Sequence, residues 1–275
     1  MLRFKQVDVF TARPFLGNPV AVVIGAEALD TSAMQRIACW TNLSETTFLL
    51  KSAKADYRLR IFTPRQELPF AGHPTIGSAH AAIESGFVPA KSSLTQECGA
   101  GIIDLSVEGS KIFLRAPSAR VSPFESRKLE AALKGEVANL KRVEVGPVWI
   151  VGEVESAAAL ASLAPDMGAL ALASDEAQAG GVTLFAKSGE SDSAIHVRSF
   201  APAHGINEDP VCGSGNISVA AYLKQTEKLP LYGCAYVARQ GMQLGRDGRV
   251  SVRVSEKGIE VGGEAVTCVD GKIVI

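Results

Sequence analysis

Two stretches of the chain are apolar with little polar relief, and each predicts a buried helix. They are Leu68–Ile83 (LPFAGHPTIGSAHAAI) and Ile206–Leu223 (INEDPVCGSGNISVAAYL). A helix that is apolar on all sides is one that protein surrounds. Both stretches contain the pattern P-x-x-G-S, at Pro74–Ser78 and at Pro210–Ser214. The recurrence predicts an internal duplication with one central helix in each half.

Alternating apolar and polar positions predict strands around both helices. Strands are expected at Leu2–Phe10, Val20–Ile24, Thr46–Leu50, Asp56–Phe62, in short segments up to about Arg115, and at Val143–Val151, Gly181–Ala186, Ala194–Phe200, Tyr232–Arg239, Arg249–Val254, Gly258–Val261 and Val266–Ile275. Two further helices are expected, one from a cap at Asp30 or Thr31 through Trp40 and one at Ser156–Leu163. The predicted fold class is α+β, with two pseudo-symmetric lobes that each wrap a mostly antiparallel sheet around a central helix.

The division between the lobes is expected near Ala116–Pro123 (APSARVSP), because proline and serine interrupt both periods there. The predicted N-terminal lobe is residues 1–118 and the C-terminal lobe is residues 119–275. For the last predicted strand, pairing with strands of the N-terminal lobe is left open. Two lobes of one plan bring two helix N-termini to comparable places, and helix N-termini bind anions.

Composition narrows the function classes. The chain has 275 residues, and 47% of them are hydrophobic, so each half can bury a core. Its net charge is −1. No basic run favours nucleic acid or an anionic membrane surface, and no stretch reaches the roughly 18 apolar residues of a membrane span. The five cysteines are scattered without a C-x-x-C pair, as in a protein with reduced thiols. We therefore expect a soluble, cytoplasmic protein.

Motifs for metals and common cofactors are missing from the sequence. The four histidines stand outside any H-E-x-x-H pattern, which argues against a metal site. Gly213-Ser214-Gly215 lacks the third glycine of a dinucleotide fingerprint, and the chain contains neither a Walker loop nor a G-x-S-x-G elbow. The sequence thus offers no motif for a metal ion, a dinucleotide or a Walker-type nucleotide site.

Glu45, in NLSETTFLL, stands between a predicted helix end and an apolar strand. A carboxylate beside apolar neighbours is partly desolvated, which raises its pKa above the reference of about 4.3 and makes it a usable proton carrier. The alternative is a surface glutamate at a strand start.

His73 and Asp209 each precede a proline of the repeat. Histidine titrates near neutral pH and suits proton transfer, but a hydrogen bond to backbone at the helix entry is an equal alternative. Asp209 is expected to cap the second central helix, with Pro210 in its first turn. One carboxylate oxygen can cap while the other faces a cavity. Glu208, next to it, is expected to be solvated.

Cys212 stands beside Gly213 at the predicted start of that helix, where a thiol pKa is lowered. The alternative is a small buried apolar residue, as free cysteines usually are. The P-x-x-G-S alignment puts Ile76 at the equivalent position of the first half. A symmetric mechanism with two cysteines is therefore not supported.

Several segments of the chain resemble the PhzF-like (phenazine biosynthesis) family. They occur in the same order as in the family, along nearly the whole chain. They are VDVFTARPFLGNPVAVV, NLSETTFLL, IFTPRQELPFAGHPTIGSAHA, the EDPVCGSGN segment and RQGMQLGR followed by GGEAV. The resemblance implies the diaminopimelate-epimerase fold, an active site between two lobes, cofactor-free isomerase chemistry and a homodimer.

The resemblance also implies roles for particular residues. The family's proton-shuttling glutamate matches Glu45, and its supporting histidine and aspartate match His73 and Asp209. Its site glycines and serine match Gly72, Gly213 and Ser214. Family members often carry threonine where this chain has Cys212. Related epimerases and racemases need a second cysteine, and that position here is Ala71.

Three function hypotheses follow. The first is a cofactor-independent isomerase in which Glu45 moves a proton on a small carboxylate or amino-acid-like substrate, and Cys212 helps to bind it. The second is an amino-acid racemase, epimerase or dehydratase that uses Cys212. The third is a non-catalytic member that binds a metabolite or a protein partner. The substrate and the pathway do not follow from the sequence.

Overall fold

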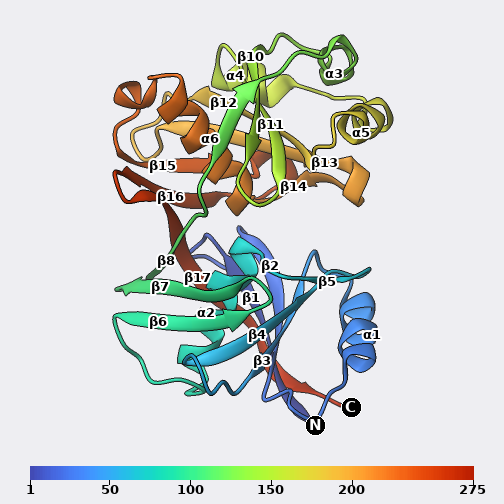
Figure 1. The fold of residues 1–275 in the computed structure, drawn as a ribbon, viewed down its shortest axis with the longest axis vertical. Helices are drawn as coiled ribbons and strands as arrows, with labels where there is room; N and C mark the ends of the chain where they lie inside the picture. Colours follow the sequence, from blue (N-terminus) through green and yellow to red (C-terminus); the bar gives the residue numbers. More distant parts are fainter. The chain divides into compact units, whose positions relative to one another are not determined.

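The computed structural model describes residues 1–275, which divide into two compact units. Unit 1 is Met1–Arg115 together with Gly262–Ile275, and unit 2 is Ala116–Val261. Each unit combines paired strands with a few helices (Figure 1). No helix of the chain is both long enough and apolar enough to cross a membrane.

Unit 1 is built from strands that surround a helix. Its strands are β1 (Leu2–Val9), β2 (Asn18–Ile24), β3 (Thr46–Leu50), β4 (Tyr57–Phe62), β5 (Glu67–Leu68), β6 (Ser93–Cys98), β7 (Gly101–Glu108), β8 (Lys111–Arg115) and most of β17 (Gly258–Ile273). Its helices are α1 (Thr31–Thr41) and α2 (Gly72–Glu84). The pairings run β8–β7–β6–β4–β3–β2–β1–β17 and return to β8, so the sheet closes on itself. Closure leaves no edge strand in this ring.

Helix α2 packs against β1, β2, β3, β4 and β8. Gly77 allows this close approach, because a Cβ atom there would lie 2.5 Å from a methyl group of Val20 and 2.8 Å from one of Val9. The helix is polar at few positions. At one of them, Ser78 Oγ lies 2.8 Å from Thr47 Oγ1 of β3. The apolar pattern of this stretch thus corresponds to burial on nearly all sides.

Helix α1 covers another part of unit 1. Asp30 caps it by accepting a hydrogen bond from Ala33 N at 2.7 Å, as the sequence predicted. Its buried side chains, Met34 and Ala38, belong to a cluster with Phe48 of β3 and Phe62 of β4. The two phenylalanine rings meet edge to face, 5.5 Å between centroids.

Unit 2 holds the remaining elements. Its strands are β9 (Arg120–Pro123), β10 (Ala138–Glu144), β11 (Val148–Glu153), β12 (Gly181–Lys187), β13 (Ile195–Ala201), β14 (Ile206–Asp209), β15 (Ala235–Gln240), β16 (Gly248–Ser255) and the beginning of β17. Its helices are α3 (Arg127–Leu133), α4 (Ala157–Ser162), α5 (Met167–Glu176) and α6 (Gly213–Gln225), with the 3-10 turns η1 (Pro202–His204), η2 (Leu229–Leu231) and η3 (Met242–Leu244).

Two groups of helices pack against the strands of unit 2. Helix α6 packs against β9, β10, β11, β12 and β16, and ten of its residues are buried. A separate apolar cluster joins α3, α4 and α5 to the strands through Leu129, Leu160 and Leu170. Burial of such clusters, at roughly 25 cal/mol per Å² of apolar surface, is the main stabilising contribution.

Several predicted elements differ from those observed. The segment expected as a linker continues into β9, which pairs with β10 along Arg120–Pro123. The single strand expected at Val143–Val151 is a hairpin, because Gly146 takes a left-handed φ of 96° and turns the chain between β10 and β11. Helices α3 and α5 were not predicted, and the two last expected strands are one continuous strand, β17.

Candidate functional site

Glu45 is placed by the connection between α1 and β3. Helix α1 ends at Thr41, and its C-cap residue Asn42, with a left-handed φ of 54°, turns the chain. Thr41 Oγ1 and Thr46 Oγ1 lie 2.6 Å apart across the connection. The carbonyl of Glu45 accepts a hydrogen bond from Ala21 N of β2, at 3.4 Å. The side chain is only 14% exposed. The carboxyl is therefore held at the start of a buried strand and largely out of water.

His73 lies in the first turn of α2 and is buried, with 7% of its surface exposed. Its Nε2 lies 3.3 Å from Glu45 Oε2, although the angle does not meet that of a hydrogen bond. The imidazole is also hydrogen-bonded to the backbone of Pro19, at the start of β2. Burial lowers the pKa of His73 to about 3, against a smaller opposing effect of that hydrogen bond. The ring is therefore neutral near pH 7.

The protonated nitrogen of this neutral ring follows from its two neighbours. Proline has no backbone N–H, so a ring N–H must donate to the Pro19 carbonyl. Nε2 faces Glu45, which leaves Nδ1 as the donor and Nε2 with a lone pair. A lone pair and an ionised carboxylate at 3.3 Å repel each other. The His73–Glu45 contact is thus most favourable when one proton lies between the two side chains.

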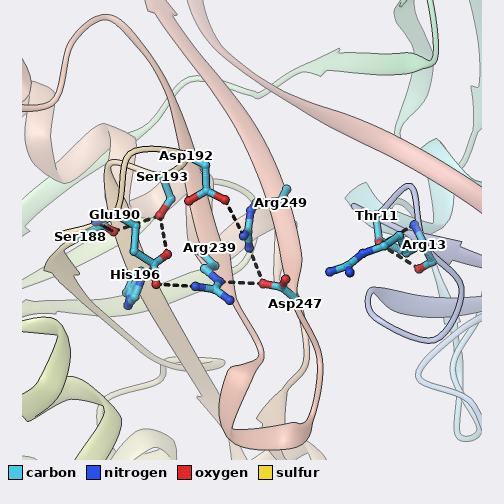
Figure 2. A network of polar contacts seen from close by, with 10 residues as sticks. All are labelled: Thr11, Arg13, Ser188, Glu190, Asp192, Ser193, His196, Arg239, Asp247 and Arg249. Atoms are coloured by element: carbon cyan, nitrogen blue, oxygen red, sulfur yellow. Dashed lines mark hydrogen bonds and ion pairs between the residues drawn. The ribbon is translucent and has the colours of Figure 1, made fainter.

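The backbone leading to Pro19 is a tight loop between β1 and β2. Thr11 Oγ1 donates to Arg13 O at 2.9 Å and accepts from Arg13 N at 3.0 Å (Figure 2). Gly17 N donates to Asp8 Oδ2 at 2.9 Å. A Cβ atom at Gly17 would lie 2.1 Å from the Val9 carbonyl oxygen, so only glycine fits. The loop therefore fixes the strand start that contacts His73.

Gly72 begins α2, and its N-cap residue, Ala71, has no side chain that could cap the helix. A Cβ atom at Gly72 would meet only Leu114, at 4.0 Å. Packing within the unit therefore does not explain the glycine. Free N–H groups at such a helix start can bind an anion.

In unit 2, Asp209 ends β14 and does not cap the following helix, so that prediction is wrong. Helix α6 begins at Gly213, and its N-cap is Cys212. Strand β14 continues through Asp209, which pairs with Ser199 of β13, and the helix starts only after this ladder. Asp209 Oδ1 accepts from Val211 N at 3.0 Å. Burial raises the pKa of Asp209 to about 6, and hydrogen bonds from Val211 N and the Cys212 thiol oppose that rise.

Cys212 is buried, with 4% of its surface exposed, and its Sγ accepts a hydrogen bond from Gly215 N at 3.2 Å. Burial raises the pKa of the Cys212 thiol well above its usual range, and the charge of Asp209 raises it further. The lowered pKa expected at a helix start is therefore wrong. The helix N–H groups favour the thiolate, but desolvation and a neighbouring carboxylate outweigh them.

Aligning the two halves by the first residue of α2 and the first residue of α6 gives a different correspondence from the P-x-x-G-S pattern. Gly72 and Gly213 are the first helical residues, so their N-caps Ala71 and Cys212 correspond. The P-x-x-G-S alignment had put Ile76 opposite Cys212. The helix starts show instead that an alanine stands at the position equivalent to the cysteine.

Ser214 follows Gly213 in the first turn of α6. Trp149 Nε1 of β11 donates to Ser214 Oγ at 3.1 Å, and Ser214 Oγ lies 3.6 Å from Cys212 Sγ. The backbone of this turn is held by Asn216, whose Nδ2 donates to Cys212 O at 2.8 Å. The start of α6 is thus a rigid, hydrogen-bonded structure. Nothing in the sequence singled out Trp149, because its partner is 65 residues away.

Glu208 is not solvated, in contrast to the prediction. Its two carboxylate oxygens accept from Arg198 Nε and Nη2 of β13, at 2.9 and 2.8 Å. Arg198 Nη1 also donates to the carbonyls of Leu160 and Leu163, at 3.0 and 2.8 Å. This buried pair joins β13, β14 and the end of α4. Sequence reasoning missed it because Arg198 lies in a strand that looked simply alternating.

A further polar network in unit 2 lies around the loop between β12 and β13 (Figure 2). Arg239 donates to Glu190 at 2.5 Å and to Asp247 at 2.7 Å. Arg249 pairs with Asp247 and donates to Asp192 at 2.9 Å. Alternating charges thus tie this loop to β15 and to the β15–β16 turn. The network contains none of the predicted site residues.

The predicted site residues therefore form two clusters. Glu45, Gly72 and His73 lie together in unit 1. The other cluster, in unit 2, consists of Asp209, Cys212, Gly213 and Ser214, joined by Trp149. The first offers a carboxyl and a neutral imidazole, the second a carboxyl, a protonated thiol and free helix N–H groups. Both sets suit proton transfer and the binding of an anion.

Comparison with known proteins gives a consistent result. A family model described as phenazine biosynthesis-like protein matches residues 7–271. Antisense-enhancing sequence 1 of Schizosaccharomyces pombe is 40% identical, over 98% of this chain and 97% of that protein. Trans-2,3-dihydro-3-hydroxyanthranilate isomerase of Pseudomonas aeruginosa is 35% identical, over 99% of each chain.

Solved structures share the fold. A phenazine biosynthesis protein of the PhzF family from Bacillus anthracis aligns with a TM-score of 0.90 and 27% identity, over 100% of this chain and 99% of that one. A hydroxyproline epimerase from Agrobacterium vitis aligns with a TM-score of 0.69 and 15% identity, over 98% and 91%. The second similarity shows the fold alone.

Proposed function

Because the chain belongs to the phenazine biosynthesis-like protein family, we propose that it is a cofactor-independent isomerase that moves a proton on a small carboxylate substrate. Several of its curated relatives are named isomerases, so isomerase is its enzyme class.

The contact between Glu45 and His73 is the observation that carries the proposal. Glu45 removes a proton from carbon and returns it at another position. For that, its carboxyl must exchange a proton easily and must be shielded from water. The neutral ring at 3.3 Å supplies a lone pair that accepts a hydrogen bond from the protonated Glu45 carboxyl, and burial shields the pair from solvent. Glu45 then acts as general base and as general acid in turn.

The cluster of unit 2 has a complementary role in this proposal. The N–H groups at the start of α6, from Gly213 and Ser214, bind the substrate carboxylate and stabilise the enolate-like charge that develops. The amide of Gly72 contributes likewise from the start of α2. Asp209, whose pKa is about 6, holds a substrate polar group and changes protonation in the working range of pH.

Cys212 is not a base in this mechanism. Its thiol is held protonated by burial and by Asp209, and Ala71 stands at the equivalent helix start of the other half. A racemase that uses two cysteines therefore lacks one of its groups here. The homodimer and the cytoplasmic location expected from the sequence stay predictions.

The test is hydrogen–deuterium exchange followed by NMR in D₂O, with a panel of amino acids, hydroxyprolines and cyclohexadiene carboxylates. We expect the wild type to incorporate deuterium at carbon in one class of these compounds. Glu45→Gln should lower the exchange rate about 10³-fold, since a positioned acid–base group contributes about 10² to 10⁴. The matched control is Glu125→Gln, which removes the same charge from an exposed position of unit 2.

Other results would point elsewhere. Full exchange in Glu45→Gln would refute the assignment of the acid–base group. Exchange that survives in Glu45→Gln but is lost in Cys212→Ala would favour the racemase or dehydratase hypothesis. Tight binding of a compound without exchange at any carbon would favour a non-catalytic binding protein.

A further inference from the structure

A row of hydrogen-bonded side chains crosses the candidate cluster of unit 2. It begins at Trp149 on β11, whose Nε1 donates to Ser214 Oγ at 3.1 Å. Ser214 Oγ lies 3.6 Å from Cys212 Sγ, within the range of a sulfur hydrogen bond. The thiol in turn is hydrogen-bonded to the carboxyl of Asp209, at the end of β14. Three separate elements thus meet in one row.

The chemistry of the two ends fixes the direction of every hydrogen bond in the row. An indole N–H can only donate, and an ionised carboxylate can only accept. Cys212 has a single proton, which it gives to Asp209. Its sulfur can then only accept from Ser214, whose own oxygen accepts from Trp149. Gly215 N donates to the same sulfur at 3.2 Å, which agrees with this assignment.

We propose that Trp149 and Cys212 are positioning residues of the reaction, which act through a one-way chain of hydrogen bonds that runs from the indole through Ser214 and the thiol to Asp209 and keeps this carboxyl ionised and ready to accept a proton. The significance of Asp209 in this statement rests on the proposed function. The chain itself does not, and it can be measured without a substrate.

The chain assigns a role to the lone cysteine. Its thiol is a donor, and burial prevents its ionisation. Any side chain at position 212 that has a single donor and can accept from Ser214 fills the same role. The chain also restricts Ser214, because its hydroxyl proton points to sulfur as long as Asp209 is ionised. When Asp209 takes up a proton, the thiol no longer has to donate to it, and the Ser214 hydroxyl becomes available to a bound carboxylate.

Other groups near Asp209 act in parallel with the chain. Val211 N donates to Oδ1 at 3.0 Å and favours the ionised form. The charge of Glu208 on the same strand opposes it, although Arg198 of β13 is paired with Glu208. Loss of the thiol donor therefore leaves the carboxyl with one donor fewer in a buried place, and the pKa of Asp209 should rise above about 6.

The test follows the Asp209 carboxyl carbon by NMR across a pH titration of the substrate-free protein. The variants are Trp149→Phe, which keeps an aromatic ring but has no N–H, and Cys212→Ala. We expect Cys212→Ala to raise the pKa of Asp209 by about 0.5 to 1 unit, as for one lost donor to a carboxylate, and Trp149→Phe to raise it by less, because the indole acts through Ser214 and the thiol. Cys212→Ser retains a donor and should restore the wild-type value. Trp40→Phe, at an exposed tryptophan of unit 1, is the matched control and should cause no shift.

The proton-exchange assay on the same variants separates this proposal from the proposed function. With a substrate, the pH profile of exchange should shift with the pKa of Asp209 in Trp149→Phe, and Cys212→Ser should exchange faster than Cys212→Ala. An unchanged pKa in both Trp149→Phe and Cys212→Ala overturns the chain. So does a Cys212→Ser variant that titrates like Cys212→Ala. If the pKa shifts as expected but exchange is unaffected, the chain stands and the role of Asp209 in the proposed function fails.

Discussion

The buried pair of Arg198 and Glu208 provides a quantitative test of how β14 is held. Both side chains are less than a tenth exposed, at 6% and 8%, and they form a bidentate contact. The guanidinium also lies over the ring of Phe200, 4.9 Å from its centroid. Because Glu208 directly precedes Asp209, this pair fixes the end of the strand that carries the candidate site carboxyl.

The expected energies follow from what each substitution leaves behind. Glu208→Gln retains the size of the side chain but leaves a buried guanidinium without a counter-charge, so we expect a loss of about 3 kcal/mol. Arg198→Met should lose about 4 to 5 kcal/mol, because it leaves a buried carboxylate and also removes the donors to the carbonyls of Leu160 and Leu163. The double variant Arg198→Met/Glu208→Gln buries no charge, and it should lose at most about 2 kcal/mol.

The assay is urea unfolding of unit 2 followed by the fluorescence of Trp149. A Trp40→Phe background makes Trp149 the only tryptophan, since the chain has two. The free energy of unfolding is extrapolated for the wild type, both single variants and the double variant. Losses below about 1 kcal/mol in both single variants, or additive losses in the double variant, would refute the argument that this pair is desolvated and coupled.

Two further predictions concern pH. Burial raises the pKa of Asp209 from 3.8 to about 6, so the ionised carboxylate destabilises the folded protein at higher pH. Asp209→Asn should therefore raise the free energy of unfolding by about 2 kcal/mol at pH 8, as measured by urea unfolding. A gain that persists below about pH 4 would contradict this explanation. Burial lowers the pKa of His73 from 6.5 to about 3, so the wild type should lose stability as the pH falls below 6.5. Between pH 7 and pH 5, the free energy of unfolding of His73→Asn should fall by about 2 kcal/mol less than that of the wild type. Equal losses in the two proteins would show that His73 ionises normally.

Local signals in the sequence were sufficient for many elements. The strand β3 was predicted at Thr46–Leu50, and the structure confirms it. The cap of α1 by Asp30 was also confirmed. Both features depend on residues within a few positions of each other, so periodicity and capping chemistry determine them. The two apolar stretches likewise became the buried helices α2 and α6.

Elements whose signals conflicted were predicted less well. In the segment EDPVCGSGN, the sequence alone favoured Asp209 as the N-cap because aspartate is a strong capping residue. Pairing of β14 with β13 keeps Asp209 in a strand, and Cys212 becomes the cap. Helix α5 was missed since its small residues gave no clear face, and its burial depends on Leu170 packing among strands of unit 2.

The sequence by itself determined where polar and reactive residues stand within the two apolar stretches and beside β3, and this singled out Glu45, His73, Asp209 and Cys212 as candidates. Only the tertiary structure decided their protonation and their partners. The contact of His73 with Glu45, the donation from Trp149 to Ser214 and the burial of Glu208 with Arg198 join residues on different elements. Desolvation and hydrogen bonding set a pKa, and both depend on how distant segments pack, which no local pattern records.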